Sequence, residues 1–253
     1  MSATGQPWSG PILGAHRTHR GGAPITCGSQ PHTRAALGTL EGMDHPYESV
    51  DDETADVVGL VAYAALAAMT RLAKDGDQAP TIETHIEHAR MAAHAFQAFE
   101  QLEVWSEHLG VDLAAVAGMY SGLFDDLDVR TRPTTWWERS VKTYVTQGVI
   151  ADMLRQVCER HEIFQDVPGP LWDMGQGNWV RANLAPRTAS DEQLAARLSL
   201  WARRVGGEVL GLMRSTLFTH PELTKGDPDT VDAIVAWVTK RHKERMAEIN
   251  LKA

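Results

Sequence analysis

Apolar residues recur at three- and four-residue steps through most of this 253-residue chain, and almost no segment alternates between apolar and polar residues. Steps of three and four place side chains on one face of an α-helix, whereas a half-buried strand requires a period of two. From residue 50 onward the sequence therefore predicts an all-α protein of about six helices, without a β-sheet.

Residues that favour helix ends mark the first two expected helices. Acidic residues at 51–53 suit the positive end of a first helix, which we expect to stop at Gly76. The second should begin at Thr81 and end at Gly110, because glycine suits a left-handed cap. Its apolar period is carried by Ile82, Ile86, Ala89, Ala93, Phe96 and Phe99.

Further helices are expected downstream. They are a short helix with a connection within Val111–Arg130, a long helix from Thr134 or Thr135 towards His161, and a helix over Leu171–Leu184 that ends before Pro186. Ser190 and Gln193 have the spacing of a capping box, which predicts another helix start. Asp227-Pro228 begins a last, strongly charged helix.

These patterns divide the chain into three parts. Residues 1–46 hold eight of the 21 glycines and no sustained apolar period, so we expect a disordered tail. An alternative interpretation is that Met43 is the true start. Residues 50–220 should form the helical bundle, and residues 227–253 a C-terminal helix.

Composition excludes several classes of protein. The formal net charge of −9 argues against nucleic-acid binding as the main activity. Only two cysteines, Cys27 and Cys158, make a disulfide framework improbable and favour a reducing cytoplasm. The longest apolar run, Val57–Met69, is shorter than the roughly 20 residues of a membrane span, so no membrane association is expected.

Two segments, Val57–Met69 and Met91–Leu102, look like the inner helices of a ferritin-like bundle. Together with the phrase LWARRVGGEVL at Leu200–Leu210, they resemble an actinobacterial family of ferritin-like fold proteins. That family is similar to the di-iron tRNA hydroxylase that acts on 2-methylthio-isopentenyl-adenosine. The resemblance implies an up-down four-helix bundle with additional C-terminal helices, and iron as the cofactor.

Metal-competent members of that family carry an acid on helix one and Glu-x-x-His on helix two. They carry another acid on helix three and Asp/Glu-x-x-His on helix four. Mapped onto this chain, the resemblance assigns those positions to Ala65, Ala95, Ala98, Gln147, Asp173 and Gln176. Only Asp173 keeps its ligand type, so the resemblance implies a degenerate metal site.

The replacements weaken metal binding for a chemical reason. A di-iron centre needs about four carboxylates to balance its charge, together with imidazoles. Alanine offers no donor atom, and glutamine offers only a neutral carbonyl oxygen. We therefore expect no cofactor, with iron as the alternative. Gln147, Asp173 and Gln176 could hydrogen-bond to one another across the old cavity, with Tyr63 or Tyr144 as further partners.

A second group of potential ligands lies on the expected second helix. His85 and His88 are three residues apart and His94 follows, so some of these imidazoles share a helix face. They are weak alternative ligands for zinc or a displaced iron site, and a solvated helix surface is the more common meaning of such a pattern.

Two carboxylates on long helices are expected to be structural. Asp152 should pair with an arginine such as Arg155 or Arg203. Glu208 should pair with Arg204 four residues earlier, beside two glycines that permit close helix contact.

Three functions remain open. The first is a non-catalytic bundle with a structural or interaction role, bound to an unidentified protein or to itself as a homodimer. The second is a divergent di-iron hydroxylase that uses Asp173 with His88 or His94. The third is a small-ligand binder with a cavity lined by Tyr63, Tyr144 and Gln147.

Overall fold

The structure is a computed structural model that describes residues 50–165 and 172–253. Within these ranges the chain is helical and contains no strand, so the predicted all-α fold is confirmed. The expected disordered tail at residues 1–46 and the alternative start at Met43 lie outside the described residues.

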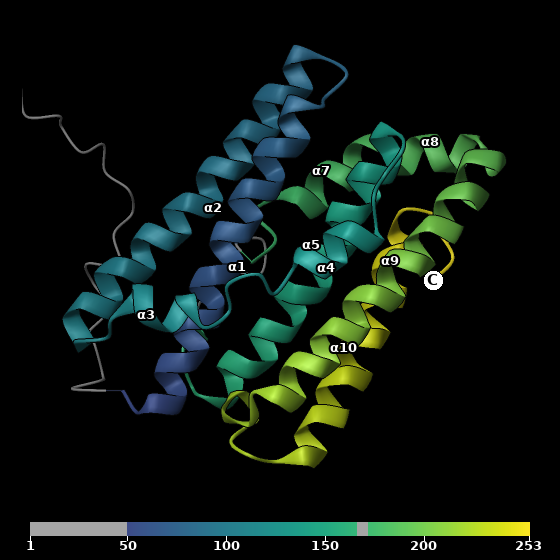
Figure 1. The fold of residues 1–253 in the computed structure, drawn as a ribbon. Helices are drawn as coiled ribbons and strands as arrows, with labels where there is room; N and C mark the ends of the chain where they lie inside the picture. Colours follow the sequence, from purple (N-terminus) through teal and green to yellow (C-terminus); the bar gives the residue numbers. More distant parts are fainter. Residues whose placement is uncertain (1–49, 166–171) are drawn as a thin grey trace, which may run out of the picture. The chain divides into compact units, whose positions relative to one another are not determined.

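Five long helices dominate the described ranges (Figure 1). They are α1 (Asp52–Asp77), α2 (Ile82–Leu109), α5 (Trp136–Arg160), α9 (Glu192–Thr219) and α10 (Pro228–Glu248). The shorter elements are α3 (Leu113–Gly118), α4 (Asp125–Arg130), α7 (Gln176–Asn183), α8 (Ala185–Ser190) and the 3₁₀ helix η2 (Pro221–Thr224).

Helix α5 is the centre of the bundle. Every residue from Ser140 to Leu154 except Thr146 is buried, which is the pattern of a helix surrounded by others. It packs against α1, α7, α9 and α10 (Figure 1). The C-terminal helix α10 therefore shares the core with the ferritin-like part of the chain.

Helix α1 runs antiparallel to α5 and also packs against α2 and α3. The direction follows from contacts at both ends, where Thr54 meets His161 and Asp75 meets Thr143. By length and composition α1 is apolar enough to cross a membrane, with a mean hydropathy of 1.5 over its most apolar stretch. In this structure the same apolar surface supplies buried core residues such as Val57 and Leu60.

Most predicted helix ends are confirmed by their caps. The Asp51 carboxylate accepts a hydrogen bond from the Thr54 backbone N–H (2.7 Å) and begins α1. Thr135 forms a capping box with Glu138 at the start of α5. Gly110 ends α2 with a φ of 69°, the left-handed conformation expected from the sequence.

The predicted capping box at Ser190 is wrong. Asp191 caps α9 instead, by accepting a hydrogen bond from the Leu194 backbone N–H (2.8 Å). Ser190 is the last residue of α8, and its hydroxyl donates back to the Pro186 carbonyl (3.1 Å). The predicted helix start is therefore misplaced by one residue, because the adjacent aspartate and not the serine forms the cap.

The predicted helix over Leu171–Leu184 is much shorter in the structure. Helix α7 begins only at Gln176, because Gly175 adopts a φ of 80° and interrupts the helical path. The predicted end before Pro186 is confirmed, because α7 ends at Asn183 and Pro186 belongs to the next helix. It occupies the first turn of α8, where its missing N–H costs nothing.

Helix α2 has two apolar faces. The residues that carried its predicted apolar period, from Ile82 to Phe96, lie on the exposed side of the helix. The face that packs into the bundle is a different set: His88, Met91, Ala92, Ala95, Leu102 and Ser106.

Candidate functional site

The residues mapped onto metal-ligand positions lie on α1, α2, α5 and α7, with Asp173 in the turn before α7. Ala65 of α1 and Ala95 of α2 are both buried, at 4% and 0% exposure. Ala98 is half-buried one turn further along α2. Three methyl groups therefore occupy this part of the interior, and none can donate electrons to a metal.

Gln176 is the first residue of α7 and is buried. Its side-chain amide donates to the Ser140 carbonyl on α5 at 3.4 Å. Its side-chain oxygen has no hydrogen-bond partner among the residues that the structure describes. Gln147 is also buried, four residues after Thr143 on α5.

Asp173 lies in the turn that precedes α7, and Gly175 rather than Asp173 is the N-cap of that helix. One carboxylate oxygen accepts a hydrogen bond from the Gly175 backbone N–H (2.9 Å). Gly177 leaves room for the carboxylate, because a β-carbon there would lie 2.3 Å from the Asp173 Oδ2 atom. Burial raises the pKa of Asp173. The expected hydrogen bonds among Gln147, Asp173 and Gln176 are not formed. Asp173 accepts instead from the Gly175 backbone N–H, and Gln176 donates to the Ser140 carbonyl.

The three histidines of α2 do not share one environment. His85 and His94 are exposed, whereas His88 is 1% exposed. The His88 ring packs edge-on against Trp179 (4.6 Å between centroids) and Trp136 (5.3 Å), and its Nδ1 atom lies 2.9 Å from the Thr84 carbonyl. Burial lowers the pKa of His88, so it stays neutral at physiological pH.

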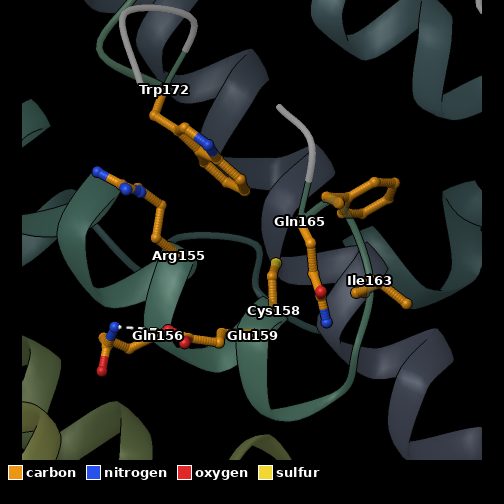
Figure 2. Close-up of a pocket in the computed structure, with 8 residues that line it drawn as sticks. Arg155, Gln156, Cys158, Glu159, Ile163, Gln165 and Trp172 are labelled. Atoms are coloured by element: carbon orange, nitrogen blue, oxygen red, sulfur yellow. Dashed lines mark hydrogen bonds between the residues drawn. The ribbon is translucent and has the colours of Figure 1, made fainter. Parts of the chain in front are cut away.

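Two cavities border the C-terminal half of α5. The first has a volume of about 300 Å³ and is lined by Arg155, Cys158, Phe164 and Trp172, among others (Figure 2). Burial raises the pKa of the Cys158 thiol, which makes it a poor nucleophile. The second has a volume of about 220 Å³, with Asp152, Asp173, Arg181 and Arg245 in its wall.

Neither cavity is lined by the tyrosines expected for a ligand pocket. The Tyr63 hydroxyl accepts a hydrogen bond from the Gly122 backbone N–H (2.8 Å). The Tyr144 hydroxyl donates to the Arg245 carbonyl (3.0 Å). Both hydroxyls therefore tie helices to their neighbours.

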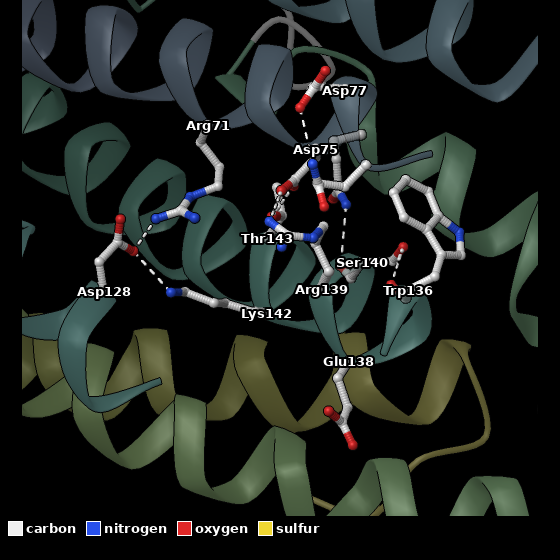
Figure 3. A network of polar contacts seen from close by, with 12 residues as sticks. Arg71, Asp75, Asp77, Asp128, Trp136, Glu138, Arg139, Ser140, Lys142 and Thr143 are labelled. Atoms are coloured by element: carbon white, nitrogen blue, oxygen red, sulfur yellow. Dashed lines mark hydrogen bonds and ion pairs between the residues drawn. The ribbon is translucent and has the colours of Figure 1, made fainter. Parts of the chain in front are cut away.

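A network of charged side chains, from the buried Asp75 to the 41% exposed Asp128, joins α1, α4 and α5 (Figure 3). Asp75 of α1 is 1% exposed and accepts hydrogen bonds from Arg139 (3.2 Å) and from the Thr143 hydroxyl. Asp128 of α4 pairs with Arg71 of α1 and with Lys142 of α5, whose Nζ atom lies 2.8 Å away. We call these six residues the interior ion network.

The interior ion network carries more positive than negative groups. Two carboxylates, Asp75 and Asp128, face three cationic side chains. Burial raises the pKa of Asp75, although Thr143 and the nearby guanidinium groups act in the opposite direction. Burial also lowers the pKa of Lys142 to about 7, while its direct ion pair with Asp128 favours the charged form.

A second buried ion pair joins α5 to α10. Asp152 pairs with Arg245 at 2.7 Å, with the two side chains 3% and 13% exposed. The prediction that Asp152 would pair with an arginine is confirmed, but the partner is Arg245 of the C-terminal helix rather than Arg155 or Arg203. Gly148 admits that arginine, since a β-carbon there would lie 2.7 Å from the Arg245 Cζ atom.

The predicted pair of Arg204 with Glu208 is wrong. Glu208 lies 3.3 Å from Arg130, the last residue of α4. Arg204 instead donates to the backbone carbonyl of Arg130 (2.8 Å). Both residues therefore attach α4 to α9.

The interior ion network could not be predicted from the spacing of residues in the sequence. Asp75 and Arg139 are 64 residues apart, so no local spacing connects them. The available signal was Arg71, a cation near the end of an otherwise apolar helix that was expected to be buried.

The described helices form an all-α architecture in which α1 packs against both α2 and the buried central helix α5. This architecture fits the class of ferritin-like proteins. Residues 48–224 match the family described as the ferritin-like domain of actinomycetes, and the chain belongs to this family. No curated protein matches the chain.

The ferritin-like fold implies iron, but the donor atoms of this chain do not fit a di-iron centre. The mapped positions supply three methyl groups, two neutral amides and the carboxylate of Asp173, which already accepts a hydrogen bond from the Gly175 backbone N–H. Within the described residues, no three His, Cys, Asp or Glu side chains form a group that could hold a metal. Lys142 and Arg139 lie within about two turns of Gln147 on α5, and their charge would oppose a bound cation.

Proposed function

We propose that this chain is a ferritin-like bundle that works without a di-iron centre, in a structural or interaction role rather than as a catalyst. The observation that carries the proposal is the pairing of buried carboxylates with side-chain cations. Asp75 pairs with Arg139, and Asp152 pairs with Arg245. In a di-iron bundle, metal ions balance the inward carboxylates.

The pairing has an energetic consequence. A buried carboxylate without a partner is costly, and breaking a buried pair typically costs about 3–5 kcal/mol. Because arginine and lysine already neutralise these carboxylates, the bundle needs no metal to fold. On this proposal, the chain descends from metal-binding relatives similar to the tRNA-modifying hydroxylase and works in the cytoplasm.

The divergent-hydroxylase alternative has less support. It requires Asp173 to join His88 or His94 around a metal. His94 is exposed, and His88 is enclosed by two tryptophans. The small-ligand alternative lacks its expected pocket, because neither of the two cavities is lined by Tyr63, Tyr144 or Gln147.

Thermal unfolding with and without metal tests the proposal. A ligand that binds the folded state raises its stability in proportion to the logarithm of its concentration over Kd. We expect the unfolding midpoint of the full chain to be the same, within about 1 °C, in chelator and in excess ferrous iron under anaerobic conditions. A rise of about 5 °C or more with iron would contradict the proposal.

A further inference from the structure

Helix α2 presents a continuous apolar strip to solvent. It consists of Ile82, Ile86, Ala89, Ala93 and Phe96, which we call the α2 seam. Ile82, Ile86 and Phe96 are 64%, 44% and 42% exposed, and the two alanines are also exposed. Helix α2 lies along α1 (Figure 1), and its buried residues are a different set from the exposed residues of the seam.

The spacing of the α2 seam is specific. Its residues follow one another at steps of four, three, four and three, which is the heptad spacing of a coiled-coil contact. Val129 of α4 and Leu200 of α9, two further large exposed apolar side chains, lie singly on their helices. Single exposed apolar residues are ordinary, whereas a contiguous strip indicates an interaction surface.

We infer that the α2 seam is a self-association surface, on which a second copy of this chain docks through its own α2 in antiparallel orientation. Two arguments select a second copy: the seam is complementary to itself in side-chain size, and its flanking charges are complementary to themselves.

Size complementarity follows from the heptad register. An antiparallel pair that places Ile86 of one copy beside Ala89 of the other also places Ile82 beside Ala93. By two-fold symmetry each contact occurs twice, with a large side chain meeting a small one each time. This alternation fills space between two helices better than layers of equal size.

Charge complementarity selects the same register. Glu83 and Arg90 flank the seam on one side, seven residues apart, and both are exposed. Neither has an ion pair with another described residue. In the antiparallel register Glu83 of each copy lies opposite Arg90 of the other, whereas a parallel pair in register would leave Glu83 without a cation.

The contact is short, so the dimer is weak. The seam from Ile82 to Phe96 spans roughly 22 Å of helix. Two such helices bury less than the roughly 800 Å² per partner of a standard interface, so we expect a reversible dimer rather than a permanent one. This inference does not rest on the absence of iron, because oligomeric state and metal content are measured separately.

Sedimentation equilibrium of the full chain between about 1 and 200 µM tests the inference. We expect a reversible monomer–dimer equilibrium. Ile86→Glu should raise the dissociation constant at least about tenfold, because it places a carboxylate in the seam. Leu200→Glu, at an apolar position on α9 that is 64% exposed against 44% for Ile86, is the control and should leave the equilibrium unchanged. Circular dichroism should confirm that both variants stay folded.

Charge reversal tests the antiparallel register. Glu83→Arg and Arg90→Glu should each weaken the dimer about threefold or more, and the double variant should return close to the original affinity. A double variant that fails to recover would overturn the register.

Other outcomes would overturn the surface itself. A full chain that remains monomeric throughout the concentration range would do so, as would a dimer insensitive to Ile86→Glu. A monomeric full chain whose version beginning at Met43 dimerises would assign the α2 seam to the N-terminal segment of the same chain, and would also overturn the inference.

Discussion

At the scale of single residues, the stability of the bundle depends on buried charges that have only a few partners. Asp75 lies at 1% exposure near the end of α1 and relies on Arg139 and Thr143 of α5. Such a carboxylate is stable as an ion only while its donors remain in place. The interior ion network therefore predicts large effects from single substitutions that leave the apolar core intact.

Arg139→Met should destabilise the protein by about 3 kcal/mol, because Asp75 loses its closest guanidinium in a buried setting. Adding Asp75→Asn should recover a large part of that loss by removing the unpaired charge. Urea unfolding of the three proteins measures this. Lys240→Met, which removes a cation at 75% exposure, is the control and should cost less than about 1 kcal/mol. Equal effects of Arg139→Met and Lys240→Met would contradict the network.

His242 gives the stability a dependence on pH. Burial, with Arg245 and Lys243 nearby, lowers the pKa of His242 to about 4. The unfolded chain binds a proton near pH 6.5 but the folded chain does not, so acid favours unfolding between pH 6.5 and 4. From pH 7 to 5 the His242 contribution should cost about 2 kcal/mol.

The comparison of the parent protein with His242→Gln isolates this effect, because the other titrating groups are common to both. The free energy of unfolding of the parent should fall more steeply between pH 7 and 5 than that of the variant. Parallel slopes would mean that His242 is protonated in the folded state at pH 5.

At the scale of elements, local signals in the sequence were sufficient for helix type and for most helix ends. Asp51, Thr135 and Gly110 end or begin helices as predicted, because caps depend on neighbouring residues only. Periodicity failed for α2, since both of its faces are apolar. Which of the two faces packs inward is decided by α1, and the sequence of α2 alone does not contain that information.

The adjacent glycines of α9 also show that the sequence of one helix does not determine which of its faces packs inward. The sequence suggested that both permit close packing, but only Gly206 faces α10. A β-carbon at Gly206 would lie 2.7 Å from the His242 Nε2 atom, whereas nothing lies within 4 Å of one at Gly207.

Gly206→Ala should therefore destabilise the protein by about 1–3 kcal/mol through overpacking against a buried ring. Gly207→Ala should be neutral or stabilising by up to about 1 kcal/mol, because alanine favours the helix and meets no obstacle. Thermal unfolding of the two variants provides the measurement. A Gly206→Ala protein as stable as the Gly207→Ala protein would show that α9 and α10 are not in close contact.

At the scale of the whole molecule, the fold class was predictable and the neutralisation of the interior was not. The resemblance assigned metal-ligand positions to Ala65, Ala95 and Gln147, and all three residues are buried in the structure. Asp75 pairs with Arg139, which is 64 residues away in the sequence, and Asp152 pairs with Arg245, which is 93 residues away. Only the packed bundle brings them together, and they support a protein that keeps a ferritin-like frame without its metal chemistry.

The iron content of the purified protein tests that central claim most directly. The full chain, expressed in iron-rich medium and purified without chelator, should contain less than about 0.1 iron atom per chain. The reason is that its inward side chains offer methyl groups and neutral amides, and its buried carboxylates are paired with cations. Close to two iron atoms per chain, retained through purification, would contradict the account.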